Sequence, residues 1–276
     1  MYKICVKQAL TPRVTLMEIE APWIAKYANP GQFVMIRIHE DGERFPLTIA
    51  DYNRDKKTIT IIFQVVGAST YLLNKLNEND YILDCAGPLG KRSELDGLKR
   101  VLLIGGGVGC AILYPILKRL RSLGTEVYTI IGFKSEAFIF LEDEFLKYSN
   151  RFTLVTDDGS KGEKGFVTDI LKKTLIEDNT YDQVITIGPL MMMKAVADIT
   201  RPYNLKTIVS MNPIMVDGTG MCGGCRIKVG DDMKFACVDG PEFDGHLVDF
   251  DLAIKRNTMY LASEKEKLNA IMDEVL

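Results

Sequence analysis

After residue 100, nearly unbroken apolar runs alternate with stretches that have the spacing of an amphipathic helix. The first run, RVLLIGGG, leads into a helix-like stretch that ends at Gly124, and later runs include EVYTIIGF, YDQVITIGP and KTIVSMN. Strands that alternate with helices form a parallel sheet, and such strands are buried on both faces, which explains their apolar character. We therefore expect residues 99–210 to form an α/β domain.

The first 98 residues follow a different pattern. Short runs rich in Val, Ile, Thr and Phe, such as RVTLMEIEA, GQFVMIRI and TITIIFQVV, are separated by Pro, Gly, Asn and Asp. Several short strands at close spacing predict a small barrel or sandwich, with one helix near residues 69–76. The stretch DCAGPLGKRSEL is interpreted as the exit from this unit because Gly and Pro interrupt it.

Length and charge narrow the functional classes. A chain of 276 residues is longer than one core usually holds, so two domains are expected. A net charge of −3 without a basic stripe argues against a nucleic-acid partner. No apolar run approaches the roughly 18 residues of a membrane span, and the N-terminus lacks the apolar stretch of a signal peptide. We expect a cytoplasmic protein whose six cysteines are free thiols or metal ligands rather than disulfides.

A glycine-rich turn, LLIGGGVGCA, joins the first apolar run to the first helix. Glycines in this position let the backbone approach a phosphate, and the helix N-terminus supplies N–H groups. The spacing is neither a strict G-x-G-x-x-G nor a P-loop. The turn is therefore either a nucleotide-binding site or a tight structural turn. Its candidate binding residues are Gly106, Gly107, Val108 and Gly109.

Two more loops are expected at the same edge of this sheet, where ligands of open parallel sheets bind. TDDGS, with Asp157, Asp158 and Gly159, follows the third strand, and IGPLMM, with Pro189 and Met192, follows the fourth. Each loop has a simpler interpretation, since the aspartates fit a turn or helix cap and the methionines fit a core stripe. Their common location favours a ligand.

Two segments within the first 98 residues are further candidates for ligand binding. RFPLT adjoins a strand and contains Arg44, Pro46, Leu47 and Thr48. VVGAST leaves a strand, turns at a glycine and begins a helix, so that its N–H groups could hold a phosphate, although an ordinary capped helix is the simpler interpretation. Its candidate residues are Val65, Val66, Gly67, Ser69 and Thr70.

Three cysteines lie within sixteen residues near the C-terminus, crowded by glycines: Cys222, Cys225 and Cys237. Three thiolates are one short of the four ligands that zinc or a simple iron–sulfur cluster normally takes. The residues alone leave open a zinc site, with His246 as the nearest histidine, or structural thiols without a metal. The other cysteines are interpreted as buried small apolar residues: Cys5, Cys85 and Cys110.

The order of a barrel and then a parallel sheet with a G-G-G-V-G turn resembles the ferredoxin-NADP⁺ reductase superfamily over about residues 1–210. The resemblance implies an FAD-binding antiparallel β-barrel, then a Rossmann-like parallel sheet that binds a nicotinamide nucleotide. With the cysteine segment, the expected domains are 1–98 for FAD, 99–210 for NAD(P), 211–250 for a [2Fe–2S] cluster, and a helical tail at 251–276.

Individual residues take roles from the same resemblance. Thr48 matches the hydroxyl that faces the flavin ring and is the expected catalytic residue. The segment of residues 65–70 matches the turn near the FAD pyrophosphate. Residues 106–109 would hold the nucleotide phosphates, with Pro189 and Met192 on the nicotinamide side.

One departure from the family pattern concerns Arg44. The family places an arginine three residues before the hydroxyl, where this chain has Phe45. A shift by one residue in a strand turns a side chain to the other face. On this reasoning Arg44 contacts FAD only if a bulge at Pro46 restores its direction.

Branches of the superfamily with a C-terminal [2Fe–2S] segment, such as the electron-transfer subunit of dihydroorotate dehydrogenase, carry the pattern C-x₄-C-x₂-C…C. Laid on this chain, the three cysteines take the last three places and an aspartate takes the first. The ligands implied by the resemblance are Asp217, Cys222, Cys225 and Cys237.

With RFPLTIADY and GMCGGCRIKVG, the aspartate narrows the resemblance to the small-subunit family of NADH-dependent reduced ferredoxin:NADP⁺ oxidoreductases. This implies an oxidoreductase subunit of an electron-bifurcating heterodimer that passes electrons between NAD(H), FAD and a [2Fe–2S] cluster. A larger flavin and iron–sulfur subunit would serve ferredoxin and NADP(H). The alternatives are an electron-transfer subunit of dihydroorotate dehydrogenase or glutamate synthase, and a zinc-stabilised nucleotide-binding protein without redox activity.

Local charge does not settle the choice between NAD and NADP. Lys134 follows the second strand, where it could pair with a 2′-phosphate, and Glu136 is the nearest acidic residue. The resemblance implies NAD(H). The helical tail is either a surface helix or part of the interface with the partner subunit, and we expect the interface because an electron-transfer subunit must dock its donor or acceptor.

Overall fold

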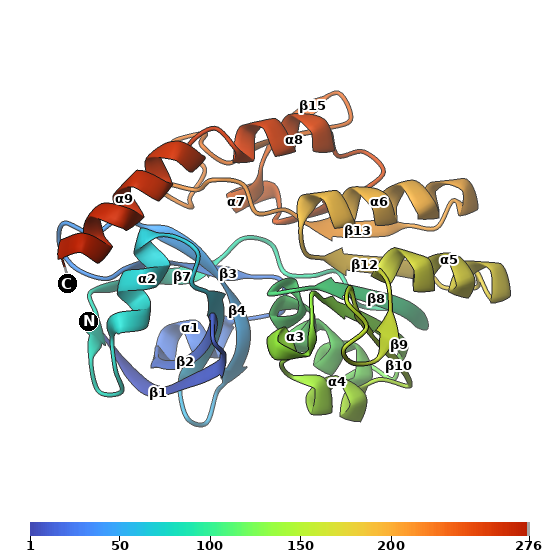
Figure 1. Cartoon of the computed structure of the whole chain (residues 1–276), viewed down its shortest axis with the longest axis horizontal. Coiled ribbons are helices and arrows are strands. Elements are labelled where there is room, and N and C mark those ends of the chain that lie inside the picture. The colour runs from blue at the N-terminus through green and yellow to red at the C-terminus, as the bar shows by residue number, and fades with distance from the viewer. Residues whose placement is uncertain (275–276) are drawn as a thin grey trace.

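The computed structural model describes residues 1–274 and shows two folded units side by side with a third segment across them (Figure 1). The N-terminal unit is a seven-stranded antiparallel sheet with the order β6-β1-β2-β5-β4-β3-β7. Because β6 runs directly into β7, the sheet forms a nearly closed barrel. The strands are β1 (Tyr2–Thr11), β2 (Val14–Glu20), β3 (Phe33–Arg37), β4 (Phe45–Asn53), β5 (Thr58–Gln64), β6 (Tyr81–Ile82) and β7 (Asp84–Leu89).

Branched apolar side chains fill the barrel because every second residue of a strand points inward. On β5, Ile59 and Ile61 are fully buried. A short helix that no sequence pattern predicted, α1 (Pro22–Tyr27), adds Ile24 to this core. The expected helix is α2 (Ala68–Lys75).

The second unit is a seven-stranded sheet with the order β11-β10-β9-β8-β12-β13-β16, parallel except for the β13–β16 pair. Side chains alternate between its faces, so that α3 and α4 pack on one face and α5 and α6 on the other. Its strands are β8 (Arg100–Gly106), β9 (Glu126–Phe133), β10 (Arg151–Thr156), β11 (Glu163–Lys164), β12 (Gln183–Ile187), β13 (Thr207–Ser210) and β16 (Glu242–Asp244). Its helices are α3 (Gly109–Ser122), α4 (Glu142–Tyr148), α5 (Val167–Glu177) and α6 (Leu190–Thr200).

Barrel and sheet share an apolar core. Val14, Ala50 and Ile62 of the barrel belong to the same buried cluster as the side chains of α3. At its edge, the Lys118 ammonium of α3 lies 2.7 Å from the Asp51 carboxylate of β4. The barrel is therefore held against the helix that follows the glycine turn.

The third segment contains the three clustered cysteines and the tail. It comprises β14 (Arg226–Val229), β15 (Asp232–Phe235), α7 (Ala236–Asp239), α8 (Phe250–Asn257) and α9 (Leu261–Glu274). An apolar cluster joins it to β3 of the barrel and to α6 and β13 of the sheet. Figure 1 shows α9 lying over α2, so the tail also reaches the barrel.

The structure confirms a barrel followed by a parallel sheet, and it corrects two local expectations. The stretch interpreted as an exit from the barrel contains β7, which pairs with β3. The stretch EAFIFLEDEFLKYS, residues 136–149, has the spacing expected of one helix, but it forms a 3₁₀ turn at Glu136–Phe138 and a separate helix α4. Phe140 interrupts them because it packs against Phe133, with ring centroids 5.5 Å apart. No helix among residues 1–274 has the length and apolarity needed to cross a membrane.

Candidate functional site

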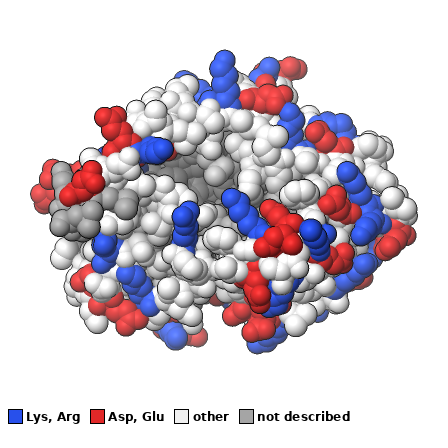
Figure 2. Space-filling view, in the orientation of Figure 1, with Lys and Arg blue, Asp and Glu red and all other residues white. Residues whose placement is uncertain are grey.

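A cavity of about 810 Å³ lies between the barrel and the carboxyl ends of the parallel strands. Figure 2 shows this face hollowed between the two units, with Lys and Arg side chains along the border. The sequence-predicted residues that line the cavity are Pro46, Thr48, Gly106, Gly107, Val108, Gly109, Asp157, Pro189 and Met192. The fold thus brings candidates from four separate segments to one space.

Strand alternation places Thr48 in this cavity. On β4, Pro46 and Thr48 line the cavity, whereas Phe45 and Leu47 pack against the barrel core. The β3–β4 register is regular, with Thr48 opposite Phe33, so no bulge occurs at Pro46. Arg44 precedes the strand and does not line the cavity.

The glycine turn meets the cavity at the start of α3. A Cβ on Gly109 would lie 2.7 Å from the Ile187 carbonyl carbon, so α3 could not approach β12 so closely with any other residue. Gly107 has a φ of +54°, and a Cβ there would meet nothing within 4 Å. Close packing therefore accounts for Gly109, whereas Gly107 turns the chain beside open space. Both interpretations of the turn are compatible with this geometry.

The methionines after β12 do not act as one stripe. Met193 is fully buried, Met191 is 63% exposed, and Met192 lines the cavity against Gly106. Pro189 precedes them as the N-cap of α6. Met193 therefore serves the core, whereas Met191 and Met192 both line the cavity.

Charged groups are few along the cavity: Arg13, Lys134 and Asp157. Asp158 does not line it and instead anchors its own loop. Its carboxylate accepts hydrogen bonds from the Ser160 hydroxyl at 2.6 Å and the Ser160 N–H at 2.9 Å. These bonds hold the pKa of Asp158 below its ordinary value, so the group stays ionised at neutral pH. Gly159, with a φ of +77°, turns the same loop.

The candidates before and in α2 lie outside this cavity. Thr70 accepts hydrogen bonds from the N–H groups of Val66 and Gly67, both at 3.1 Å, which is a capping arrangement. Val65 packs against the barrel core. The Ser69 hydroxyl donates to the Glu43 carboxylate at 3.2 Å, and Glu43 also pairs with Lys267 of α9.

Arg44 is engaged elsewhere in the barrel. Its guanidinium donates to the Asp84 carboxylate at 3.0 Å, and both groups are partly exposed. An exposed ion pair of this kind contributes little to stability, about 0–1 kcal/mol. Contact between Arg44 and FAD therefore remains a prediction, and it would require Arg44 to leave Asp84.

The four predicted metal ligands form two pairs. The Cys222 thiol lies 3.4 Å from one carboxylate oxygen of Asp217, and the Cys225 and Cys237 sulfurs lie 3.2 Å apart. Among residues 1–274, no three or more His, Cys, Asp or Glu side chains converge on one metal position. Pairs of ligands suit a cluster with two metal ions better than a single tetrahedral zinc, which needs four ligands around one point.

The surrounding backbone suits anionic ligands. The N–H groups of Gly224 and Cys237 each point at a cysteine sulfur at 3.4 Å. N–H groups of Thr219, Met221 and Cys222 bond the Asp217 carboxylate at 3.0 Å, which lowers the pKa of that carboxyl to about 2. Burial next to Cys225 raises the pKa of the Cys237 thiol, so a bound cation is needed to hold Cys237 as a thiolate.

The cluster loop touches the wall of the cavity. A Cβ on Gly218, next to Asp217, would lie 2.5 Å from the Met35 side chain of β3. Met215 lines the cavity and belongs to the same buried apolar group as Cys225 and Cys237. One buried apolar cluster therefore extends from the cavity wall to the cysteine site.

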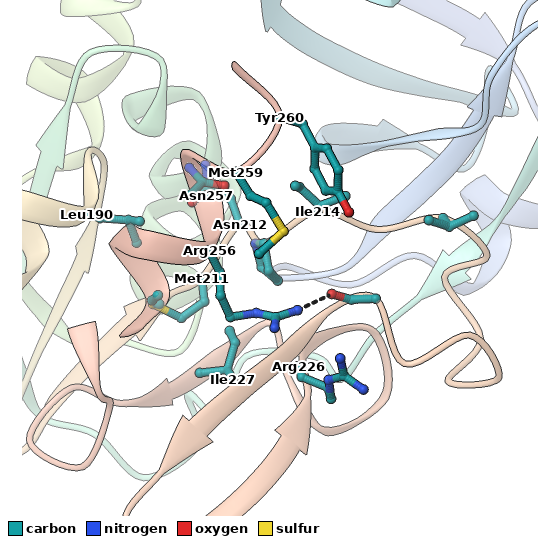
Figure 3. Close-up of a pocket in the computed structure, with 14 residues that line it drawn as sticks. Leu190, Met211, Asn212, Ile214, Arg226, Ile227, Arg256, Asn257, Met259 and Tyr260 are labelled. Carbon is teal, nitrogen blue, oxygen red and sulfur yellow. Dashed lines mark hydrogen bonds between the residues drawn. The ribbon is translucent and has the colours of Figure 1, made fainter. Parts of the chain in front are cut away.

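A second cavity, of about 390 Å³, lies between the cysteine segment and the bend from α8 to α9 (Figure 3). The Arg256 guanidinium of α8 donates to the Gly224 carbonyl at 3.2 Å across it. Most of the lining is apolar, including Met259 and Tyr260, and no acidic side chain contributes. Met211 and Asn212 line both cavities.

Comparison with known proteins identifies the family. Residues 212–249 match the iron-sulfur cluster binding domain of dihydroorotate dehydrogenase B, and residues 103–198 match the oxidoreductase NAD-binding domain. A dihydroorotate dehydrogenase B (NAD(+)) electron transfer subunit homolog of Thermotoga maritima is 47% identical, covering 90% of this chain and 87% of that protein. The chain belongs to the family of dihydroorotate dehydrogenase B electron-transfer subunits.

Other members and neighbours agree with this family. The electron transfer subunit of Fusobacterium nucleatum is 35% identical, covering 82% of this chain and 89% of that protein. A solved structure of the NADH-dependent reduced ferredoxin-NADP oxidoreductase, studied for flavin-based electron bifurcation, is 42% identical with a TM-score of 0.93, covering 99% of this chain and 98% of that one. This likeness confirms the narrower resemblance inferred from the sequence.

A ferredoxin NADP+ reductase from Neisseria gonorrhoeae with bound FAD and NADP shares the fold alone. It is 19% identical with a TM-score of 0.60, covering 73% of this chain and 89% of that one. As a member of its family, the present chain is a flavoprotein oxidoreductase that uses FAD, a [2Fe–2S] cluster and NAD(H). The zinc alternative is therefore wrong.

Several cavity residues escaped prediction, and one cysteine was misjudged. Phe33 and Gln64 lie on predicted strands, so strand alternation beside Thr48 was the signal available. Met211 lies at the carboxyl end of the predicted strand KTIVSMN, which was a signal of the same kind, whereas Met215 and Pro241 lie in irregular segments that carry none. The expectation of burial is confirmed for Cys85 and Cys110 and is wrong for Cys5, which is exposed. Burial raises the pKa of the Cys85 thiol to about 12, so this thiol is inert at neutral pH.

Proposed function

We propose that this chain is the small subunit of an electron-bifurcating NADH-dependent ferredoxin:NADP⁺ oxidoreductase, which exchanges electrons with NAD(H) and relays them to a larger subunit. The observation that carries the proposal is the position of Met215, which lines the cavity and belongs to the same buried apolar cluster as Cys225 and Cys237. An electron relay requires two cofactor sites that adjoin within one chain, and this cluster connects them.

The barrel residues would hold FAD and the glycine turn would hold the nucleotide. When bound, FAD supplies two-electron exchange with a nicotinamide and one-electron exchange with an iron–sulfur cluster. Thr48 offers a hydroxyl from β4 to the ring, and Gly107 leaves room for phosphates at the N-terminus of α3. Pro189 and Met192 lie beside the glycine turn, against Gly106, and would exclude water from the nicotinamide side.

The proposed cluster ligands are the two pairs, Asp217 with Cys222 and Cys225 with Cys237. Each pair would bind one iron. The backbone N–H groups of Gly224 and Cys237 already point at sulfur and would stabilise the ligand charge.

Nucleotide selection would favour NAD(H). Asp157 lines the cavity, and Asp158 stays ionised in the same loop, so both carboxylates would repel a 2′-phosphate. Lys134 is the opposing cation. Anaerobic reduction of the FAD-loaded chain by NADH and by NADPH tests this preference, and faster reduction by NADPH would overturn it.

The larger subunit would dock beside the cluster. Apolar side chains are exposed around the second cavity, including Val216, Met259, Tyr260 and Leu261, each more than half exposed. The bend between α8 and α9 carries three of these residues, which supports an interface role for the tail. Relatives named dihydroorotate dehydrogenase B electron transfer subunits support a second candidate, the equivalent subunit of a dihydroorotate dehydrogenase.

Co-expression with each type of larger subunit distinguishes the two candidates. We expect a stable heterodimer with the flavin and iron–sulfur subunit of a ferredoxin:NADP⁺ oxidoreductase, and loss of that heterodimer on the substitution Tyr260→Asp. Ile176→Asp, at an exposed position of α5, is the control because it places the same charge far from the cluster segment. Assembly only with a dihydroorotate dehydrogenase catalytic subunit would contradict the first proposal.

A further inference from the structure

A carboxyl group that the electron relay does not use is buried where barrel and sheet meet. Glu242 begins β16, the antiparallel edge strand of the sheet, and its carboxylate accepts a hydrogen bond from the Ser93 hydroxyl at 2.6 Å. Ser93 lies between β7 of the barrel and β8 of the sheet, and its N–H donates to the Pro30 carbonyl at 2.9 Å. The contact therefore links the edge of the sheet to the barrel.

The backbone around Glu242 is closely packed. A Cβ on Gly31 would lie 2.5 Å from the Ser93 hydroxyl and 3.0 Å from the Glu242 carboxylate. The Lys91 N–H donates to the Gly240 carbonyl at 2.7 Å. Glu242 is thus enclosed by a barrel turn, the linker of residues 90–95 and its own strand.

This junction forms the back of the main cavity. Pro241, next to Glu242, lines the cavity and accepts a hydrogen bond from the Met211 N–H at 2.9 Å. Met211 and Phe33 line the same wall. A shift of β16 relative to the barrel would therefore change the space in which the nicotinamide would lie.

No cation compensates the charge of this carboxyl. Among residues 1–274, no basic side chain forms an ion pair with Glu242. The charged residues of the linker and of β16 are Lys91, Arg92, Glu94 and Asp244. Burial raises the pKa of Glu242, the Ser93 hydrogen bond lowers it and the charge of Glu94 raises it, and together they bring it to about 7.

We propose that Glu242 is a positioning residue for nicotinamide-nucleotide binding, which keeps the edge of the sheet closed on the barrel while its carboxyl is protonated. Ionisation places an uncompensated charge at the closed junction, and hydration of that charge favours separation of β16 from the barrel. Nucleotide affinity then falls as the pH rises through neutrality. This inference rests on the proposed nucleotide site between barrel and sheet.

Calorimetric titration of the FAD-loaded full chain with NADH, after anaerobic reduction of its cofactors so that no hydride is transferred, tests the inference over about 2.5 pH units, from roughly pH 6 to pH 8.5, around the Glu242 pKa of about 7. In the native chain the Kd for NADH should rise with pH by at most about tenfold per unit, because one proton is linked to binding. Glu242→Gln keeps the hydrogen-bond acceptor without the charge and should give a Kd that does not vary with pH.

Two further variants should move the midpoint of the pH dependence of the Kd in opposite directions. Ser93→Ala removes the hydrogen bond that favours the ionised carboxyl, so the midpoint of the pH dependence should move to higher pH. Glu94→Gln removes the neighbouring negative charge and should move it to lower pH. These two shifts test whether the ionisation of Glu242 controls NADH affinity, even if the Glu242→Gln chain does not fold.

A wild-type pH profile in the Glu242→Gln chain, or shifts of both other variants in one direction, would overturn the inference. NADH binding that is independent of pH in the native chain would overturn the inference and leave the proposed site intact. Absence of NADH binding at every pH would overturn the proposed site and the inference with it.

Discussion

At Gly109, helix α3 comes so close to strand β12 that no side chain fits between them. Gly109→Ala should lower the free energy of unfolding by about 1–3 kcal/mol, because its Cβ would overlap the backbone of Ile187. Gly107→Ala should cost about 1–2 kcal/mol through its positive φ alone, since it meets no neighbour. Denaturant unfolding of both variants measures the difference. A Gly109→Ala chain with the same free energy of unfolding as the native chain would contradict the close approach of α3 to β12.

Asp217 offers a residue-scale test of the cluster ligands. Asp217→Ala should lose iron, because Cys222 would keep no partner for the iron that the pair binds. Asp217→Cys should retain iron with an altered visible and paramagnetic resonance spectrum, since a thiolate replaces a carboxylate. Asp231→Ala, an exposed aspartate in the same segment, is the control. Native iron content and an unchanged spectrum in Asp217→Ala would remove Asp217 from the ligand set.

Glu242 should make stability depend on pH. Its pKa is about 7 in the folded chain and has its ordinary value, 4.5, when unfolded. Between these values the unfolded chain releases the proton while the folded chain keeps it, so stability falls as the pH rises and levels off above about 7. The loss is on the order of 3 kcal/mol at most.

Thermal unfolding of the native and Glu242→Gln chains across this range measures the effect. The Gln variant should lack the loss and be the more stable chain at pH 8, a value chosen about one unit above the Glu242 pKa. Parallel stability curves for the two chains would show that Glu242 ionises freely in the folded state.

At the scale of elements, α8 supports the cluster loop from outside. The Arg256 guanidinium donates to the Gly224 carbonyl, which lies between Cys222 and Cys225. Arg256→Met should keep the fold and the apolar contact but release iron faster in the presence of a chelator. Lys255→Met, an exposed neighbour on the same helix, should behave as the native chain. Equal rates of iron loss in all three chains would show that α8 does not restrain the loop.

Helices and strands could be predicted from the sequence where the pattern of their own residues determines the structure. The apolar parallel strands and α3 followed from periodicity, because each buries a continuous face. Strand β7 did not, because its Gly and Pro resemble a loop and only pairing with β3 makes it a strand. Cys5 was misjudged for a related reason, since nothing local indicates which face of β1 turns to solvent.

At the scale of the whole molecule, the site depends on contacts between distant segments. The sequence placed Thr48, the glycine turn and the cysteines in separate units, and the cavity unites the first two. The two-by-two pairing of the ligands and the role of Met215 could not be predicted, because they depend on how the third segment packs across barrel and sheet. The Arg44–Asp84 pair likewise joins residues that no local pattern connects.

The central claim is that one chain relays electrons between NAD(H), FAD and a [2Fe–2S] cluster. The most direct measurement reduces the anaerobically purified chain with dithionite and then adds NAD⁺, while absorption and paramagnetic resonance follow both cofactors. The account predicts that iron and labile sulfide are present in equal amounts and that NAD⁺ reoxidises both the flavin and the cluster. Reoxidation of the flavin with the cluster left reduced, or a chain without iron, would contradict it.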